Sequence, residues 1–519
     1  MPPLGAAEPS LEGLLGLDEA RSALANGGNA VVWRRVVADV HTPIAAALKL
    51  IEPGRGDFLL ESVEGGETRG RYSLLGLDPD LLFRADEASG AVNRQWQRDR
   101  SAFEPLPGNA MEQLRSLADR CRFDVPDGLP PALSCLVGYF GYETIGLVET
   151  LPRAPASDLA LPDMLFARPT VLLVFDRLSD DLFAIAPLWA DAIGKSATGA
   201  IESAASRIDA VLSRLAEPLP LRPYEDAAPI SLSDDVQLEA TIEEAEYAAM
   251  VARAKDYIAA GDIFQVVLAQ RFTSPFPLPP LSLYRALRRV NPSPFLYFLD
   301  LPGFAVVGSS PEILVRVRDR EVTIRPIAGT RPRGATESED RANEASLLSD
   351  AKELAEHLML LDLGRNDVGR VAEQGSVTVT DSFVIERYSH VMHIVSNVVG
   401  RLAPGRDAID ALFAGFPAGT VSGAPKLRAC EIIAELEPET RGAYAGAVGY
   451  FAPDGSVDSC IVLRTAVVKD DVMHVQAGAG IVADSDAASE AAECRHKAGA
   501  LLAAAQEAIA LARQANGTR

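Results

Sequence analysis

The segment Pro326–Gly334, with the sequence PIAGTRPRG, concentrates groups that bind small anions. Gly329 lets backbone N–H groups approach a ligand closely, and Thr330 adds a hydroxyl. Arg331 and Arg333 add two guanidinium groups. The competing interpretation is an ordinary turn with solvated arginines, because short Gly/Pro strings are common in turns. The segment alone does not decide between the two.

Two predicted helices each carry a pair of carboxylates three residues apart. Glu353 and Glu356 share one helix face, as do Glu490 and Glu493, with Lys497 one turn further along. Each pair taken alone is typical of a solvated helix face. Carboxylates gathered from distant segments, with no Cys or His pairing, suit a hard ion such as Mg²⁺.

Four motifs occur in one order along the chain: DAKELAEHLMLLDLGRNDVGRV at Asp350–Val371, FPAGTVSGAPK at Phe416–Lys426, GAVGYF at Gly446–Phe451 and QAGAGI at Gln476–Ile481. In this order and spacing they resemble the chorismate-utilising enzymes, specifically the anthranilate synthase component I family. The resemblance is strong from Thr241 to Ala505. It is weaker in the first 215 residues, where Leu59–Ser62 (LLES) and Arg71–Gly76 (RYSLLG) carry it.

The resemblance implies a metal site and acid–base groups. The positions that match Glu356 and Glu493 bind Mg²⁺ in the family, and we expect Glu490 in the same site. Glu312, in GSSPEILV, matches the acid that protonates a leaving hydroxyl.

His393 is the second acid–base candidate, although a core or surface histidine is the competing interpretation. His390 and His393 are expected on opposite faces of one strand. Glu353 is a candidate base for a ring proton, and Thr420, with Ser422, lies in a turn-like segment where a ligand hydroxyl could meet it.

The implied substrate, chorismate, carries two carboxylates, so the site needs donors and cations. Arg464, expected within a strand at Ser459–Val468, is the candidate for a bidentate carboxylate clamp, with a surface ion pair as the alternative. Tyr444 adds a phenolic donor and Lys497 a cation. The remaining substrate-binding candidates are backbone positions: Gly329 and Thr330, and an expected turn at Gly478, Ala479 and Gly480.

The resemblance implies that ammonia and chorismate give anthranilate and pyruvate. Two related reactions are disfavoured at single positions. Aminodeoxychorismate synthase typically has a nucleophilic Lys where this chain has Ala328, and isochorismate synthases have a Lys base where it has Gln265. A catalytically dead regulatory paralogue is the third alternative. We find no glutaminase motif, so a separate amidotransferase partner in a hetero-oligomer is expected.

Two segments resemble the family's tryptophan-binding elements, which implies feedback inhibition. The first is LLES, with Glu61 and Ser62, and the second is NPSPFLY, with Pro294, Phe295 and Leu296. The competing interpretation of LLES is the half-buried end of a strand.

The composition excludes several classes of protein. With 49 Lys and Arg against 72 Asp and Glu, the formal net charge is −23, which argues against nucleic-acid or anionic-membrane partners. No apolar run approaches the roughly 20 residues that span a bilayer. The N-terminus lacks the features of a signal peptide, and the five cysteines lack CxxC spacing. We therefore expect free buried thiols and a cytoplasmic protein.

Strands and helices are mixed along the chain without a regular βαβ repeat, which favours an α+β fold. The resemblance implies two β-sheets packed face to face and flanked by helices. A proline-rich stretch, Ala216–Pro229, predicts a linker that divides the chain into an N-terminal region (1–215), a linker (216–240) and a catalytic domain (241–519). Strands are expected at 30–33, 170–175, 263–268, 295–299, 304–307, 313–317 and 322–324, and helices at 200–215, 247–260, 345–361 and 489–513. Thr241 and Glu244 suggest a capping box before the helix at 247–260.

Overall fold

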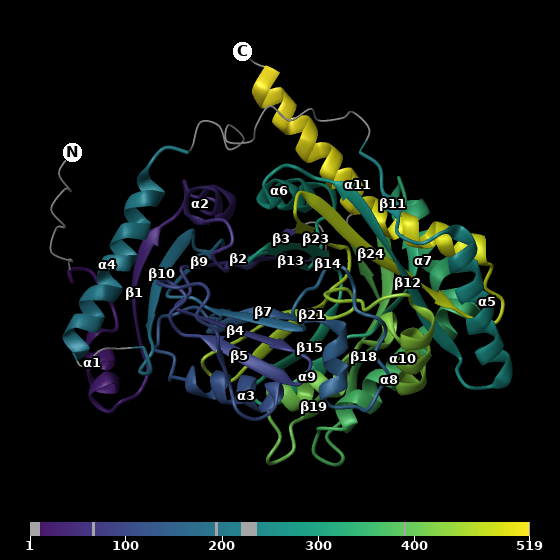
Figure 1. Ribbon diagram of the computed structural model, residues 1–519, viewed down its shortest axis with the longest axis horizontal. Coiled ribbons are helices and arrows are strands. Elements are labelled where there is room, and N and C mark those ends of the chain that lie inside the picture. The colour runs from purple at the N-terminus through teal and green to yellow at the C-terminus, as the bar shows by residue number, and fades with distance from the viewer. Residues whose placement is uncertain (1–10, 65–67, 193–195, 220–235, 389–390, 518–519) are drawn as a thin grey trace.

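The computed structural model describes residues 11–64, 68–192, 196–219, 236–388 and 391–517. Within these ranges the chain forms two antiparallel β-sheets of twelve strands each, with helices around the outside (Figure 1). Tyr139 of one sheet packs edge-on against Phe304 of the other, with ring centroids 6.1 Å apart. The predicted α+β fold with face-to-face sheets is confirmed.

The first sheet runs, in spatial order, β1 (Ala30–Val37), β10 (Asp181–Leu188), β9 (Val171–Asp176), β3 (Thr68–Leu77), β2 (Asp57–Glu64), β13 (Phe295–Leu301), β14 (Phe304–Ser310), β23 (Thr465–Lys469), β24 (Val472–Ile481), β12 (Gln265–Pro275) and β11 (Glu239–Ala240). The short β20 (Gly423–Ala424) also pairs with β12.

The second sheet runs, in spatial order, β17 (Ile327–Pro332), β19 (Val391–Arg401), β16 (Glu321–Ile324), β15 (Ile313–Arg318), β22 (Val457–Ile461), β21 (Ala447–Phe451), β7 (Leu136–Phe140), β8 (Met164–Arg168), β4 (Leu81–Asp86), β5 (Ser89–Asn93) and β6 (Glu104–Pro105). The strand β18 (Thr378–Arg387) pairs with β19 as well.

Helices cover the outer faces. The first sheet is contacted by α1 (Leu17–Ala25), α2 (Pro43–Leu50), α4 (Ala197–Ala216), α5 (Glu244–Ala260), α6 (Pro280–Val290), α10 (Lys426–Leu436) and α11 (Ala487–Gly517). The second is contacted by α3 (Ala110–Arg120), α7 (Glu337–Ser349), α8 (Ala351–Gly369) and α9 (Ala408–Gly415). Two 3₁₀ segments, η1 (Tyr142–Leu147) and η2 (Gly419–Val421), lie in connections.

Both sheets combine strands from the two ends of the chain. In the first sheet β2 pairs with β13, and in the second β7 pairs with β21. Residues before and after the predicted linker therefore share two continuous sheets. Most of that linker, residues 220–235, lies outside the described residues.

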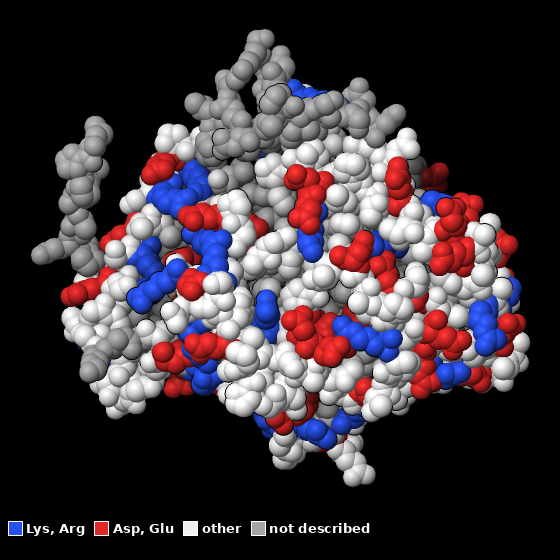
Figure 2. Space-filling model, in the orientation of Figure 1, with Lys and Arg blue, Asp and Glu red and all other residues white. Residues whose placement is uncertain are grey.

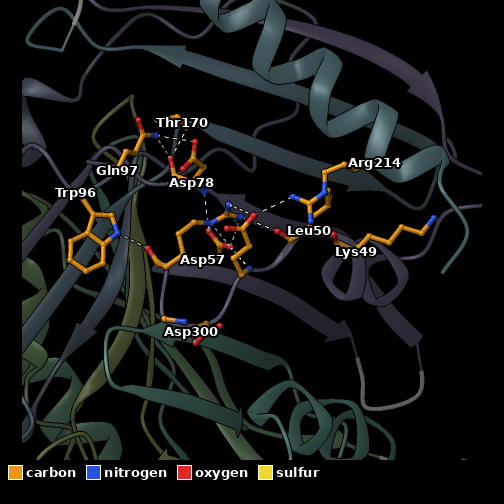
Figure 3. A network of polar contacts seen from close by, with 12 residues as sticks. Lys49, Leu50, Asp57, Asp78, Trp96, Gln97, Thr170, Arg214 and Asp300 are labelled. Atoms are coloured by element: carbon orange, nitrogen blue, oxygen red, sulfur yellow. Dashed lines mark hydrogen bonds and ion pairs between the residues drawn. The ribbon is translucent and has the colours of Figure 1, made fainter. Parts of the chain in front are cut away.

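A network of polar contacts stabilises the pairing of β2 with β13 (Figure 3). Asp57 and Asp300 are directly opposite each other in the two strands. Arg55 binds both oxygens of Asp57 through Nε, at 2.9 Å, and the N–H of Gly54 donates to Asp300 Oδ1 at 3.1 Å. The indole N–H of Trp96 donates to the carbonyl of Arg55 at 2.7 Å. The guanidinium offsets the repulsion expected between two facing carboxylates.

Most predicted elements are confirmed, with boundaries that differ by a few residues, and three details are wrong. The helix expected at 345–361 is two helices, because Asp350 ends α7 and caps α8 through the N–H groups of Lys352 and Glu353. The Thr241 capping box is absent, because Thr241 bonds the carbonyl of Arg271 instead and α5 begins at Glu244 without a side-chain cap. The strand expected at 263–268 begins at 265 and extends to 275.

The five cysteines are all buried and free, as predicted. Across the described part of the chain, no helix is long and apolar enough to cross a membrane. On the face seen in Figure 2, Lys and Arg side chains are interspersed with Asp and Glu rather than gathered in one patch.

Candidate active site

A cavity of about 880 Å³ lies where the chain passes between the two sheets. Glu312 lines it from the crossing between β14 and β15, and Arg464 lines it from the crossing between β22 and β23. Arg464 was expected inside a continuous strand. That prediction is wrong, because the chain turns there with Arg464 at φ 48° to change sheets. The turn places the guanidinium at the cavity.

The anion-binding segment is one wall of the cavity. PIAGT belongs to β17, which has a bulge between Ala328 and Thr330, and Gly329 has φ 76°. A Cβ on Gly329 would lie 3.2 Å from Glu353 Oε2 and 3.1 Å from Leu347. Only glycine therefore fits this position without strain. The ordinary solvated turn is excluded, because the segment is a sheet strand with Ala328, Gly329 and Thr330 at the cavity.

His393 lies opposite Thr330 on β19. Its Nδ1 is 3.1 Å from the carbonyl of Gly329 and 3.0 Å from the hydroxyl of Thr330. A carbonyl only accepts, so Nδ1 carries the proton and Nε2 of the neutral ring is an acceptor. Burial lowers the pKa of His393 to about 4, so the ring is neutral at physiological pH. The geometry favours a base or acceptor over a charged acid. His390 lies outside the described residues.

Glu312 is the strongest candidate acid. Its side chain is 7% exposed, and Thr420 donates a hydrogen bond to Oε2 at 3.1 Å. Burial raises the pKa of Glu312 to about 8, against the opposing effect of the Thr420 bond. A carboxylic acid that keeps its proton near neutral pH can protonate a leaving hydroxyl.

Glu353 lines the cavity beside β17. Arg331 donates to Glu353 Oε1 at 3.0 Å and to Asp350 Oδ2 at 2.7 Å. Asp350 in turn caps α8, and Glu353 lies in the first turn of that helix. Arg331 therefore positions the predicted base instead of facing solvent. The cap and the pairing fix where the start of α8 meets β17.

Glu356 and Glu493 reach the same cavity from α8 and α11. Burial, and then the nearby carboxylate of Glu353, raises the pKa of Glu356. Glu493 pairs with Lys497 Nζ at 2.7 Å, and the same ammonium donates to the carbonyl of Gly478 at 2.8 Å.

A magnesium ion fits this arrangement. No group of three or more His, Cys, Asp or Glu side chains in the described ranges forms a metal site by itself. Mg²⁺ commonly uses only one or two carboxylates, with waters and substrate oxygens completing its shell. The crowding that raises the pKa of Glu356 is the environment that a cation would relieve.

Arg464 has no ion-pair partner among the described residues, and burial lowers its pKa. An unpaired, largely desolvated guanidinium inside a cavity is expected to attract an anion. Tyr444 lines the cavity beside Gly478, where a Cβ would lie 2.9 Å from the phenolic oxygen.

Three candidate residues do not line the cavity: Ala479, Gly480 and Glu490. The AGAG segment was expected to be a turn, and this is wrong, because it lies inside β24 and pairs with β12. Alternation along the strand turns Ala479 away. A Cβ on Gly480 would lie 2.4 Å from the amide nitrogen of Gln265, which separates it from the cavity. Glu490 lies near Tyr247 instead, where burial, then Cys494 and then Glu490 raise the pKa of the phenol.

The predicted tryptophan-binding residues form a separate group beside the cavity. Leu296 of β13 is directly opposite Glu61 of β2, so the two motifs are adjacent strands. Glu61 is buried, accepting from Arg288 at 2.9 and 3.0 Å and from Tyr284 at 2.8 Å. Ser62 follows, half-buried, while Pro294 and Phe295 lead into β13.

Gln265, which the sequence marked as a neutral residue at a position discriminating between reactions, lines the cavity and hydrogen-bonds Glu356. The sequence did not single out the buried pair Arg441–Glu437, which holds the site. Arg441 is buried, pairs with Glu437 at 2.6 Å, and donates to the carbonyls of Val421 and Val267 at 2.7 Å. Its helical i, i+4 spacing from Glu437 would not have predicted this contact, because Glu437 lies just beyond the end of α10.

Comparisons with known proteins agree with this geometry. Residues 58–503 match the model of the chorismate binding enzyme family. Anthranilate synthase component 1 of Cereibacter sphaeroides is 54% identical over 94% of this chain and 97% of its own, and that of Pseudomonas putida is 48% identical over 92% and 94%.

Solved structures point the same way. Anthranilate synthase component I of Streptococcus pneumoniae superposes with a TM-score of 0.74 at 36% identity, covering 90% of this chain and 99% of that one. A menaquinone-specific isochorismate synthase of Escherichia coli, at 19% identity and a TM-score of 0.65, shares the fold. Together with the cavity described above, these matches show that the chain belongs to the chorismate binding enzyme family and, within it, to the anthranilate synthase component 1 proteins.

Proposed function

We propose that this chain converts chorismate and ammonia to anthranilate and pyruvate, the first committed chemistry of a tryptophan pathway. Ammonia adds to C2 of the ring while the 4-hydroxyl leaves as water. The C2 proton is then removed, the enolpyruvyl C–O bond breaks, and pyruvate departs as the ring becomes aromatic. The cavity volume of about 880 Å³ is ample for a single-ring dianion of this size.

The observation that carries the proposal is a protonated acid and an unpaired cation in one cavity. Glu312 keeps its proton up to about pH 8 and can give it to the departing hydroxyl. Arg464, without an ion-pair partner in the described residues, is available for a substrate carboxylate. Neutral His393 and the Arg331-bound Glu353 are the candidate acceptors for the C2 proton.

Two positions at the cavity support ammonia addition over the related reactions. Ala328 lines the cavity and has no nucleophilic atom, which argues against capture of the ring by the protein. Gln265 lines it too, with its amide bound to Glu356, and a neutral amide is no base for water. Aminodeoxychorismate synthase and isochorismate synthase activities are both disfavoured.

We further propose that Glu356 and Glu493 hold Mg²⁺. The ion would neutralise the ring carboxylate, which lowers the cost of bringing a dianion into a cavity that also holds three carboxylates. If Glu493 held the ion, Lys497, which now pairs with Glu493, would be available to a substrate carboxylate.

The remaining parts of the proposal concern partners and control. An amidotransferase subunit would supply ammonia from glutamine, in a hetero-oligomer, in the cytoplasm, where the five free thiols would stay reduced. Tryptophan would bind at Glu61, Ser62 and Pro294–Leu296 and inhibit the enzyme.

Product analysis tests the proposal. The purified protein is incubated with chorismate, Mg²⁺ and ammonium, and in parallel with glutamine in place of ammonium. We expect anthranilate from ammonium alone and none from glutamine until an amidotransferase is added. Isolation of 4-amino-4-deoxychorismate or isochorismate as the sole product would refute the assignment.

A further inference from the structure

A buried ion pair lies at the base of the loop that carries Thr420, where the two ends of the loop meet. Lys426 Nζ lies 2.9 Å from both carboxylate oxygens of Asp367, and the two side chains are 7% and 9% exposed. The same ammonium lies 3.3 Å from the carbonyl of Gly415. Gly415 ends α9 and Lys426 begins α10, so one cation ties together both ends of the segment 416–425.

Asp367 attaches this loop to the helix that carries the candidate metal ligand. It lies near the C-terminal end of α8, the helix whose first turns carry Glu353 and Glu356. Within the loop, Ser422 donates to the carbonyl of Ala418 at 2.8 Å. The ion pair thus sets the distance between α8 and the segment from which Thr420 donates to Glu312.

A small cavity of about 30 Å³ separates the pair from the acid. Glu312, Thr420, Asp367 and Gly415 all line it, with aliphatic groups of α8 between them. Because the lining of this small cavity is mainly aliphatic, a charge left at the pair would be screened less toward Glu312 than it would be in water. At present the two opposite charges cancel.

We propose that the Asp367–Lys426 pair is a positioning device for the reaction: it holds Thr420 against the Glu312 carboxyl and keeps uncompensated charge away from the rear of that acid. The role of Glu312 as a catalytic acid rests on the proposed function, whereas the hydrogen bond from Thr420 to Glu312 is observed directly. Lys426 and Asp367 touch no part of the substrate cavity, and they act through Thr420 and Glu312.

The direction of the charge effect follows from the surroundings of Glu312. On the substrate side, none of the titratable or charged groups that line the cavity with Glu312 forms an ion pair with it: Glu353, Glu356, His393, Tyr444, Arg464, Glu493, His496 and Lys497. On the rear side stand Asp367 and Lys426. Asp367→Asn leaves an unpaired cation, which favours the ionised Glu312. Lys426→Met leaves an unpaired anion, which favours the protonated form.

Infrared titration of Glu312 tests this without turnover. The spectrum of each protein minus that of its Glu312→Gln derivative isolates the C=O stretch of protonated Glu312. We expect the midpoint to fall in Asp367→Asn and to rise in Lys426→Met, in each case by up to about one pH unit, the lower end of what a charge within about 6 Å causes. Lys426→Arg, which keeps the cation, should titrate as the wild type does.

A matched ion pair far from the site controls for a merely structural effect. Arg168 and Asp80 form a bidentate pair at 2.8 and 2.9 Å with Arg168 2% exposed. Arg168→Met and Asp80→Asn should lower thermal stability but leave the Glu312 midpoint unchanged.

The double variant Asp367→Asn/Lys426→Met covers the case in which a single variant fails to fold, because it leaves no unpaired buried charge. It should lower kcat by about tenfold or more, up to the roughly 10²- to 10⁴-fold contribution of a general acid, with a smaller change in KM for chorismate. The proposal is overturned if the Glu312 midpoints of the two single variants move in the same direction or move no further than in the controls. It is also overturned if kcat of the double variant is unchanged. A wild-type product other than anthranilate would refute the proposed function instead, and the infrared result would stand on its own.

Discussion

Glu312 has surroundings that keep it protonated to about pH 8, and this predicts the pH dependence of the reaction. An acid must be protonated to act, so at fixed free ammonia kcat should fall as pH rises through about 8. Glu312→Gln should lose about 10²- to 10⁴-fold of kcat at all pH values, the usual contribution of a general acid. Steady-state rates from pH 6 to 10 measure the pH dependence and the loss in the variant. If kcat of Glu312→Gln still fell as pH rises through about 8, that fall would belong to another group.

The carboxylates of Glu356 and Glu493 predict the metal dependence. Glu356→Gln and Glu493→Gln should each lose most activity, because removing a ligand weakens the ion's stabilisation of transition-state charge by several kcal/mol. Both proteins should keep the wild-type circular dichroism spectrum. Calorimetric titration with Mg²⁺ in the presence of chorismate should show weaker binding in both. Near-normal rates in either variant at low Mg²⁺ would rule out a shared site.

Gly329 has a positive φ that places it between β19 and the start of α8 at the cavity, and this conformation requires glycine. Gly329→Ala should destabilise the protein by about 1–3 kcal/mol, because φ is positive and the new Cβ meets Glu353 and Leu347. Gly303 has φ 85° with nothing within 4 Å of a Cβ, so Gly303→Ala isolates the backbone strain. Urea denaturation should show a smaller loss for Gly303→Ala, and only Gly329→Ala should lower kcat. Equal effects on stability and no effect on rate would contradict this role of Gly329.

At the level of elements, the sequence predicted the helices and strands whose hydrophobic periodicity is local. The strands and helices that carry the motifs are confirmed, and twelve of the fifteen catalytic, substrate and metal candidates line one cavity. Three predictions failed: Arg464 changes sheet, Gly478–Gly480 pair inside β24, and Asp350 splits a helix. The first two depend on contacts between distant segments, which a local pattern does not reveal. The Asp350 cap is local, and an Asp three residues before Glu353 is a helix-start signal that the sequence offered.

The strands β2 and β13 are the elements through which tryptophan would act. Arg288 of α6 donates a hydrogen bond to Glu61. Val290, two residues after Arg288, ends α6 and lines the substrate cavity. A ligand bridging Ser62 and Pro294–Leu296 would bias α6 and thereby the cavity. A coupling free energy of about 1–3 kcal/mol is typical of such control.

Ser62→Arg tests this site. The long cation should fill the space and abolish inhibition by tryptophan, while chorismate turnover stays nearly unchanged. Inhibition curves for the wild type and the variant measure the difference. A wild type indifferent to tryptophan, or a variant that is fully inhibited, would contradict the assignment.

At the level of the whole molecule, the seam between the two ends of the chain contains Asp300, whose pKa burial raises to about 7. An unfolded Asp titrates near 4, so the folded state loses stability as pH rises from there through about 7, because the buried carboxylate must ionise. Asp300→Asn keeps an acceptor for the N–H of Gly54 and cannot ionise. It should melt as the wild type does at pH 5 and at a higher temperature at pH 8. A lower melting temperature at pH 8 would show that the charge is stabilising.

The central claim is that this cavity joins ammonia to chorismate and releases pyruvate. Incubation with chorismate, Mg²⁺ and ¹⁵N-ammonium, followed by mass spectrometry, tests it most directly. The account predicts anthranilate carrying one ¹⁵N and an equimolar amount of pyruvate. Nitrogen-labelled product that retains the enolpyruvyl group, or pyruvate released without nitrogen incorporation, would contradict it.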